Sequence, residues 1–195
     1  MPTGVALRDV REQLFAAAER VLLRAGPAGL TSRAVTAEAG VAKGVLHKHF
    51  ADFDAFLAEL VVDRTAQLTL QEAALRAGAG RGDVIGTVTD TLTRLFSSIA
   101  AAVLALVIAR DGLRARLRAT TPTGVPMLTE ATWMVAGYLA AEKDAGRIAA
   151  DADVDMLALT LIGSSHLMTA GGEAPTPDPA AVRKVVTTVL AAVLS

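Results

Sequence analysis

Apolar residues recur every three or four positions through most of the chain, which is the spacing of one face of an α-helix. The first such segment covers residues 7–25 and stops at Gly26-Pro27, a typical helix end. Thr31 is a suitable N-cap for a short helix through residue 39. After a glycine turn, a third short helix is predicted over residues 43–50.

The remaining helices are longer, and Asp52 is the expected cap of the first of them. The spacing predicts helices over about 54–76, 83–109, 111–119, 126–145, 153–170 and 179–194. The predicted loops contain glycine or proline and cover 78–82, 120–126 and 171–179. The first loop is no phosphate loop, because no strand precedes it and no Gly-Lys-Ser/Thr follows. With about nine helices and no convincing strand, the sequence predicts an all-α fold.

Composition agrees with packed helices and excludes several classes of protein. The chain of 195 residues is 52% hydrophobic but only 4% aromatic, and it contains no cysteine. Disulfides, a thiolate nucleophile and cysteine-ligated metals are therefore excluded. The start of the chain lacks a secretory signal, and the longest apolar run, 99–109, is shorter than the ~20 residues of a membrane span. We expect a cytoplasmic protein with no membrane segment.

The net charge of −1 conceals an uneven distribution. Residues 1–50 carry seven basic and four acidic side chains, for +3, so the rest of the chain carries −4. A basic head on an acidic body is a reason to ask whether the head meets a polyanion.

Residues 30–50 have the order helix, glycine turn and second helix, as in a helix-turn-helix. No acid occurs between residues 39 and 51, and the second helix carries Lys43, His47, Lys48 and His49. A narrow basic helix suits the major groove of DNA. A solvated helix of a bundle would carry the same charges, so charge and turn leave both readings open.

Specific residues of this segment match a known family. The stretch Thr31–Phe50, followed by Asp52–Leu57, resembles the DNA-binding domain of TetR-type transcriptional regulators, and the preceding helix fits the same pattern. The resemblance covers roughly the first 60 residues. Its specific matches are Ala39-Gly40-Val41, Gly44, Leu46 and His49-Phe50.

The resemblance implies a homodimeric repressor that releases a palindromic double-stranded DNA operator when a small-molecule effector binds. Residues 5–57 would form the DNA-binding domain, and 58–195 the ligand-binding and dimerisation domain. The expected DNA-contacting residues are Thr31, Arg33, Lys43, Gly44, His47, Lys48 and His49. In the family the last two helices pair between subunits, here about 153–170 and 179–194. Both carry apolar stripes, which would pack equally well within their own subunit.

Four positions depart from the family pattern: Ala42, Val45, His47 and Phe53 stand where polar groups usually touch phosphate. Three of them have lost the donor, and a hydrogen bond to a charged group is worth ~1.5–3 kcal/mol. The alternative is therefore a ligand-binding or interaction protein of the TetR fold without operator binding.

Large residues of the body are the candidates for a pocket: Phe96, Trp133, Met134, Tyr138, His166 and Met168. Each would serve equally well as core. They predict a hydrophobic or aromatic ligand. No cofactor, metal or catalytic residue is expected, because His47 and His49 point ~200° apart on a helix and Ser165 and His166 are sequence neighbours without a nucleophile elbow.

Overall fold

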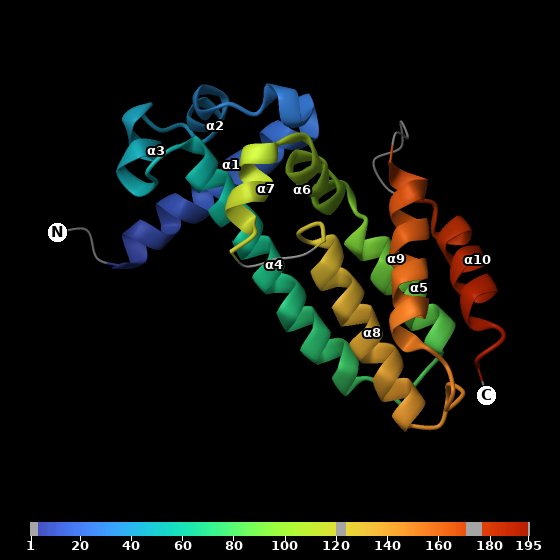
Figure 1. Ribbon diagram of the computed structural model, residues 1–195. Coiled ribbons are helices and arrows are strands. Elements are labelled where there is room, and N and C mark those ends of the chain that lie inside the picture. The colour runs from blue at the N-terminus through green and yellow to red at the C-terminus, as the bar shows by residue number, and fades with distance from the viewer. Residues whose placement is uncertain (1–3, 120–123, 171–176, 195) are drawn as a thin grey trace. The chain divides into compact units, whose positions relative to one another are not determined.

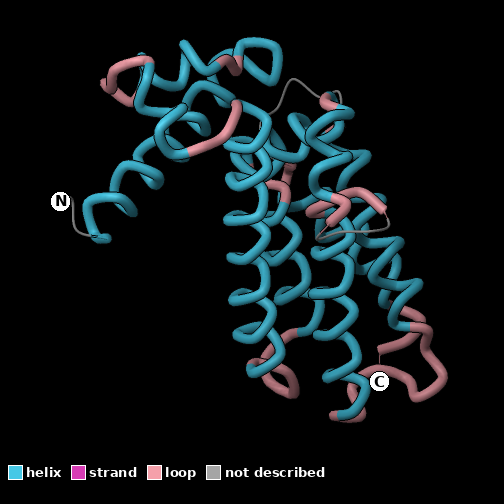
Figure 2. The backbone as a smooth tube through the Cα atoms, turned by 60° about the vertical axis from the view of Figure 1, so that its left-hand side comes forward, coloured by secondary structure: helices cyan, strands magenta, loops and turns pink. Residues whose placement is uncertain are grey.

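The computed structural model describes residues 4–119, 124–170 and 177–194, and over these residues the chain is helical (Figures 1 and 2). The elements are α1 (Gly4–Gly29), α2 (Ser32–Glu38), α3 (Gly44–His49), α4 (Phe53–Ala77), α5 (Val84–Leu95), α6 (Ser98–Ala109), α7 (Asp111–Leu117), α8 (Leu128–Asp144), α9 (Val154–Thr169) and α10 (Pro179–Leu190). The all-α prediction is confirmed. The predicted loops at 120–126 and 171–179 fall partly outside the described residues.

The described residues form ten helices where the sequence predicted about nine, because residues 83–109 form two helices. Phe96 leaves the helical conformation, with φ −100° and ψ 23°, and is only 3% exposed. The hydroxyls of Thr89, Thr91 and Thr93 each donate to the carbonyl four residues earlier. Such bonds compete with the helical ladder and bend helices. The break therefore combines local weakening with burial of one aromatic ring.

Contacts divide the chain into two compact units. The first comprises Met1–Asp63 and Ala102–Pro126, and the second Arg64–Ala101 and Met127–Ser195. Residues 102–119 and 124–126, which the sequence placed in the body, thus belong to the same compact unit as the helix-turn-helix. Helix α4 runs through both units without interruption.

Aromatic side chains form the centre of the first unit. The ring of Phe56 lies 5.0 Å from Phe50 and 5.6 Å from Phe15, between centroids. Glu38 of α2 accepts hydrogen bonds from Arg20 and Arg24 of α1, which lower the pKa of this carboxyl. These contacts fix α1, α2 and α4 around one apolar core.

Two ion pairs tie the end of α6 and helix α7 to the start of α4. Arg110 donates to Asp54 at 3.0 Å, and Arg116 donates to Asp52 at 2.7 Å. The Ala55 backbone N–H, at 2.7 Å from Asp52, confirms the predicted cap. That hydrogen bond, and then Arg116, lower the pKa of Asp52.

The second unit is a bundle in which α9 packs against α8 and α10, and α10 packs against α5. The apolar stripes predicted on the last two helices face this core: Val182, Val186, Leu190, Leu161 and Ile162 are at most 2% exposed. They therefore stabilise their own subunit. Among the described helices, none is by itself long and apolar enough to cross a membrane; α5 and α6 pass that test only when counted together.

Candidate functional site

Local hydrogen bonds shape the turn between α2 and α3. Thr31 Oγ1 accepts the Ala34 backbone N–H at 3.1 Å, which confirms the predicted cap of α2. Gly40 has φ +68°, a left-handed conformation that favours glycine. The Val41 backbone N–H then donates to the Thr36 carbonyl at 3.0 Å. The turn leads directly into α3.

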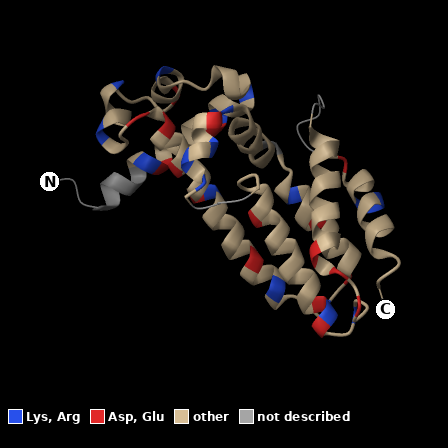
Figure 3. Ribbon diagram, viewed as in Figure 1, with Lys and Arg blue, Asp and Glu red and all other residues tan. Residues whose placement is uncertain are grey.

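Helix α3 is anchored by one side and exposed on the other. Leu46 is fully buried, whereas Lys43, Gly44, His47 and Lys48 are exposed. His49 is half-buried, with its ring 6.5 Å from that of Phe50. In Figure 3 the blue segments mark lysine and arginine positions on this part of the ribbon.

A groove of about 470 Å³ lies between α2 and α3. Its lining contains four of the seven predicted DNA-contacting residues, together with Ser32 and Thr36: Arg33, Lys43, Gly44 and His47. Thr31 lines a neighbouring cavity, which also includes Phe53 and Arg110. Lys48 and His49 line neither. The structure thus brings the basic positions of α2 and α3 to one groove of the first unit.

Three of the four departures from the family pattern have visible consequences. Helix α3 starts without a side-chain cap, in agreement with Ala42 at the turn. Phe53 stacks on Phe56 at 5.7 Å, and the Arg110 guanidinium lies 5.7 Å from the Phe53 ring. Val45 is half-buried. Phe53 therefore packs rather than presenting a donor.

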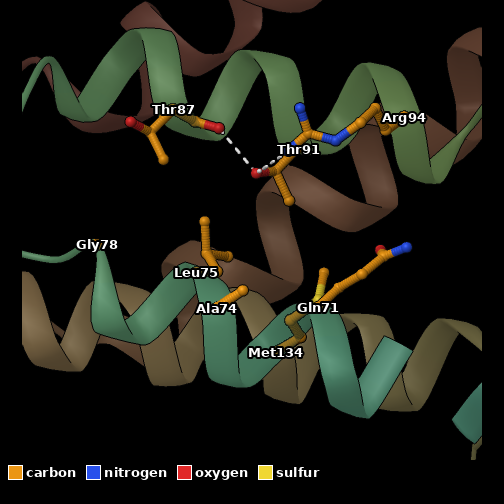
Figure 4. Close-up of a pocket in the computed structure, with 8 residues that line it drawn as sticks. All are labelled: Gln71, Ala74, Leu75, Gly78, Thr87, Thr91, Arg94 and Met134. Carbon is orange, nitrogen blue, oxygen red and sulfur yellow. Dashed lines mark hydrogen bonds between the residues drawn. The ribbon is translucent and has the colours of Figure 1, made fainter. Parts of the chain in front are cut away.

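The second unit contains a cavity of about 390 Å³ between α4, α5 and α8 (Figure 4). It is lined by Gln71, Ala74, Leu75, Gly78, Thr87, Thr91, Arg94 and Met134. The Thr91 hydroxyl donates to the Thr87 carbonyl at 2.8 Å, and Arg94 Nη2 donates to Thr91 Oγ1 at 3.4 Å. Half of the lining residues are thus polar.

Of the six predicted pocket residues, the structure places one in the cavity lining, and the others are buried, partly buried or exposed elsewhere. Met134 lines the cavity, while Phe96 and Tyr138 are buried. Trp133 is 57% exposed, because it lies one position away from the buried Met134, and Met168 is 36% exposed near the end of α9. The His166 ring is 6.4 Å from that of Phe96.

Gln71, Thr87, Thr91 and Arg94 line the cavity but were not predicted. Polar residues on a helix are expected to be solvent-exposed, and Gln71 and Arg94 are exposed in the structure, whereas Thr87 is half-buried and Thr91 is buried. Nothing in the sequence distinguishes these four residues from other polar residues at the surface.

A buried polar cluster lies beside the cavity, around Tyr138 and Glu142. Glu142 is fully buried, accepts the Gly80 backbone N–H at 3.1 Å and pairs with Arg147 at 3.3 Å. The cluster holds the 78–82 segment, which is a loop as predicted. Burial, and next the Glu142 carboxylate, raise the pKa of Tyr138 to about 12.

We expect Tyr138 to make the protein less stable in alkali. The unfolded state loses the phenol proton near pH 10, and the folded state retains it until about pH 12. The free energy of unfolding should therefore fall by about 1.4 kcal/mol per pH unit between these values, and this contribution should be constant below pH 10. Because the chain has one tyrosine, tyrosinate absorbance reports this group alone.

Tyr138→Phe is the matched control for the alkaline decline. The Tyr138 hydroxyl makes no hydrogen bond within the described structure, so the substitution should change stability at neutral pH by less than about 1 kcal/mol. Denaturant unfolding of both proteins from pH 8 to 12 provides the comparison. Equal declines in the two proteins would show that other groups cause the effect.

Ser165 and His166 are not joined by a hydrogen bond in the described structure. Ser165 Oγ and His166 Nδ1 are both buried, and each lacks a hydrogen-bond partner among the described residues. The same part of the chain contains no group of three or more histidine, aspartate or glutamate side chains suited to a metal ion.

Comparison with known proteins assigns the first unit. Residues 14–60 match the family model of the bacterial regulatory proteins of the tetR family. The chain therefore carries a tetR-family domain at residues 14–60. It is a TetR-like DNA-binding transcriptional regulator, and regulators of this family bind operators and small-molecule effectors and function as dimers.

Solved structures show the TetR fold over the whole chain. A TetR transcription regulator from Haloarcula marismortui has a TM-score of 0.70 at 16% identity, covering 96% of this chain and 100% of its own. SmeT of Stenotrophomonas maltophilia, the repressor of the multidrug efflux pump SmeDEF, has 0.65 at 17%, covering 95% and 90%. FadR of Bacillus subtilis, in complex with stearoyl-CoA, has 0.65 at 17%, covering 92% and 97%. No curated protein matches in sequence.

Proposed function

We propose that the chain is a dimeric repressor that reads its operator with α2 and α3 and releases it when a small molecule enters the α4/α5/α8 cavity. The observation that carries the proposal is the exposed basic groove on a TetR-family helix-turn-helix. Exposed cations bind phosphate, and an uncovered helix can enter the major groove. Such a regulator would act in the cytoplasm.

Helix α4 is the element that would couple the two events. It begins at Phe53, beside Phe56 of the first unit's core, and its Gln71, Ala74 and Leu75 line the cavity of the second. A ligand that binds one position of α4 better than another would change the populations of the two states. SmeT, a repressor of the same fold, provides a precedent for this class of function.

Operator binding is tested by selecting duplexes from random DNA and measuring their affinity by fluorescence anisotropy at several salt concentrations. We expect Lys43→Gln and Lys48→Gln each to weaken binding and to reduce the salt slope by about one. Arg81→Gln, an exposed charge change in the 78–82 loop, is the matched control and should leave both unchanged.

The alternative is a TetR-fold protein that binds a ligand but no operator, and the uncapped α3 and the packed Phe53 favour it. It would be supported if the selection returned no duplex bound more tightly than random DNA at low salt. Equal loss of affinity in Lys43→Gln and Arg81→Gln would also count against the groove.

We also propose that dimerisation uses the exposed face of α9. The buried stripes of α9 and α10 are occupied by their own subunit, but α9 exposes a second apolar row formed by Met156, Leu159 and Leu167, with exposed fractions of 55%, 53% and 75%. Gly163 lies in the same row and is exposed. A row of large apolar residues around a glycine suits close packing against a second copy. The exposed positions of α10 include Arg183 and Lys184, so its share in the interface is polar.

A further inference from the structure

Charge in the α4/α5/α8 cavity is confined to one side chain, Arg94 of α5. No acidic residue lines the cavity among the described residues. Arg94 also forms no ion pair there, although Asp90 lies four residues earlier, a spacing at which helical charges often pair. Arg94 and Gln71 are both exposed, so they lie at the open side of the cavity, where a cation without a carboxylate partner can receive an anion.

The hydrogen-bonding capacity of Arg94 is largely unused. A guanidinium has five N–H donors, and the described structure gives Arg94 one side-chain acceptor, Thr91 Oγ1 at 3.4 Å. Gln71 on the facing helix α4 makes no hydrogen bond with any described residue, so its amide is a second available donor. In Figure 4 the Arg94 guanidinium turns back along α5 toward Thr91, and Gln71 lies on the facing helix α4 with its amide extending away from Leu75.

The rest of the cavity has a different character. Ala74, Leu75 and Met134 contribute apolar surface, and Leu75 lies away from the Arg94 end in Figure 4. The Thr91 hydroxyl proton is already given to the Thr87 carbonyl at 2.8 Å. The cavity is therefore amphipathic, with a cationic end and an apolar wall.

We infer that the cavity binds a monocarboxylate with an apolar body, held at its carboxylate by Arg94 and Gln71. A planar guanidinium matches a carboxylate with two parallel hydrogen bonds. One cation balances one negative charge, so the site pairs fully with a monoanion. This inference sharpens the predicted hydrophobic or aromatic ligand by adding an acidic group, and it rests on the proposed function in taking the cavity as the effector site.

Isothermal titration of the full chain with four probes tests the inference without DNA. Decanoate and 2-naphthoate carry the carboxylate, and 1-decanol and 2-naphthol are their neutral counterparts, all used below the concentrations at which they aggregate. At least one acid should bind more tightly than its neutral counterpart. Arg94→Gln should weaken binding of that acid about tenfold or more and leave the neutral probe unchanged.

Two further variants distinguish this site from non-specific binding. Arg81→Gln removes the same charge outside the cavity and should leave both affinities unchanged. Leu75→Trp fills the apolar part and should weaken acid and neutral probe alike. Thermal unfolding verifies that each variant is folded. The inference is overturned if neither acid binds, if neutral probes bind as tightly, or if the Arg81 and Arg94 variants lose affinity equally.

The operator experiment has an independent outcome. If the acids bind through Arg94 but no duplex is selected, the cavity inference holds and the repressor proposal fails. If a duplex is selected and neither acid binds, the repressor proposal holds and the cavity takes another class of ligand.

Discussion

Phe56→Ala should lower the free energy of unfolding by about 3–5 kcal/mol, the range found for phenylalanine removed from a packed core. The side chain is fully buried, and its ring lies within 6 Å of the rings of Phe15, Phe50 and Phe53. Truncation removes these three aromatic contacts and leaves a void where α1, α3 and α4 meet. Because domains are stable by only ~5–15 kcal/mol, operator binding should weaken as the head unfolds.

Urea unfolding followed by circular dichroism measures this loss, and Phe53→Ala is the matched control. Phe53 is half-exposed and contacts Phe56 from the rim, so the same truncation should cost less than half as much. Phe56→Leu, which retains most of the volume, should fall between them. Equal costs at positions 53 and 56 would contradict the assignment of Phe56 to the centre of the head.

The helix-turn-helix of the first unit could be predicted from the sequence because the residues that fix its helix ends and its turn act locally. The Thr31 and Asp52 side chains cap helices within three residues of themselves, and Gly40 sits in the left-handed turn between α2 and α3. The glycine at the end of the first helix is equally local, since Gly26 has φ +64°. The residues that make short-range hydrogen bonds, and the glycines that favour left-handed turns, can be recognised in a single sequence without an alignment.

The break between α5 and α6 could not be predicted in the same way. Residues 93–98 contain no proline or glycine, and the helix ends where the Phe96 ring enters the core. The ring's destination depends on helices distant in sequence, one of which brings His166 to 6.4 Å. Tertiary packing therefore decides where the helix stops.

The cavity illustrates the same limit for function. Large aromatic side chains were the natural candidates, but in a body rich in small residues they serve as core, as Phe96 and Tyr138 do, or lie exposed, as Trp133 does. The lining comes from three helices, each contributing residues that are unremarkable along the chain. Arg94 and Gln71 line the cavity because α4 faces α5, and not because of their size.

Leu159→Arg should convert the dimer into a monomer. In the proposed interface Leu159 lies in the exposed apolar row of α9, and a two-fold axis would bury two arginines per dimer without acidic partners. An unpaired buried charge costs ~3–5 kcal/mol, so the dissociation constant should rise by more than about 100-fold. Sedimentation velocity at micromolar concentration measures the change.

The matched control is Leu70→Arg, the same substitution at a 75% exposed leucine on α4. This variant should remain dimeric, and both variants should fold, because neither side chain belongs to a core. Dissociation by Leu70→Arg alone would move the interface to α4. Operator affinity should fall together with dimerisation in Leu159→Arg. Two DNA-binding units joined by one interface bind the two half-sites of a palindrome more tightly than separate units do.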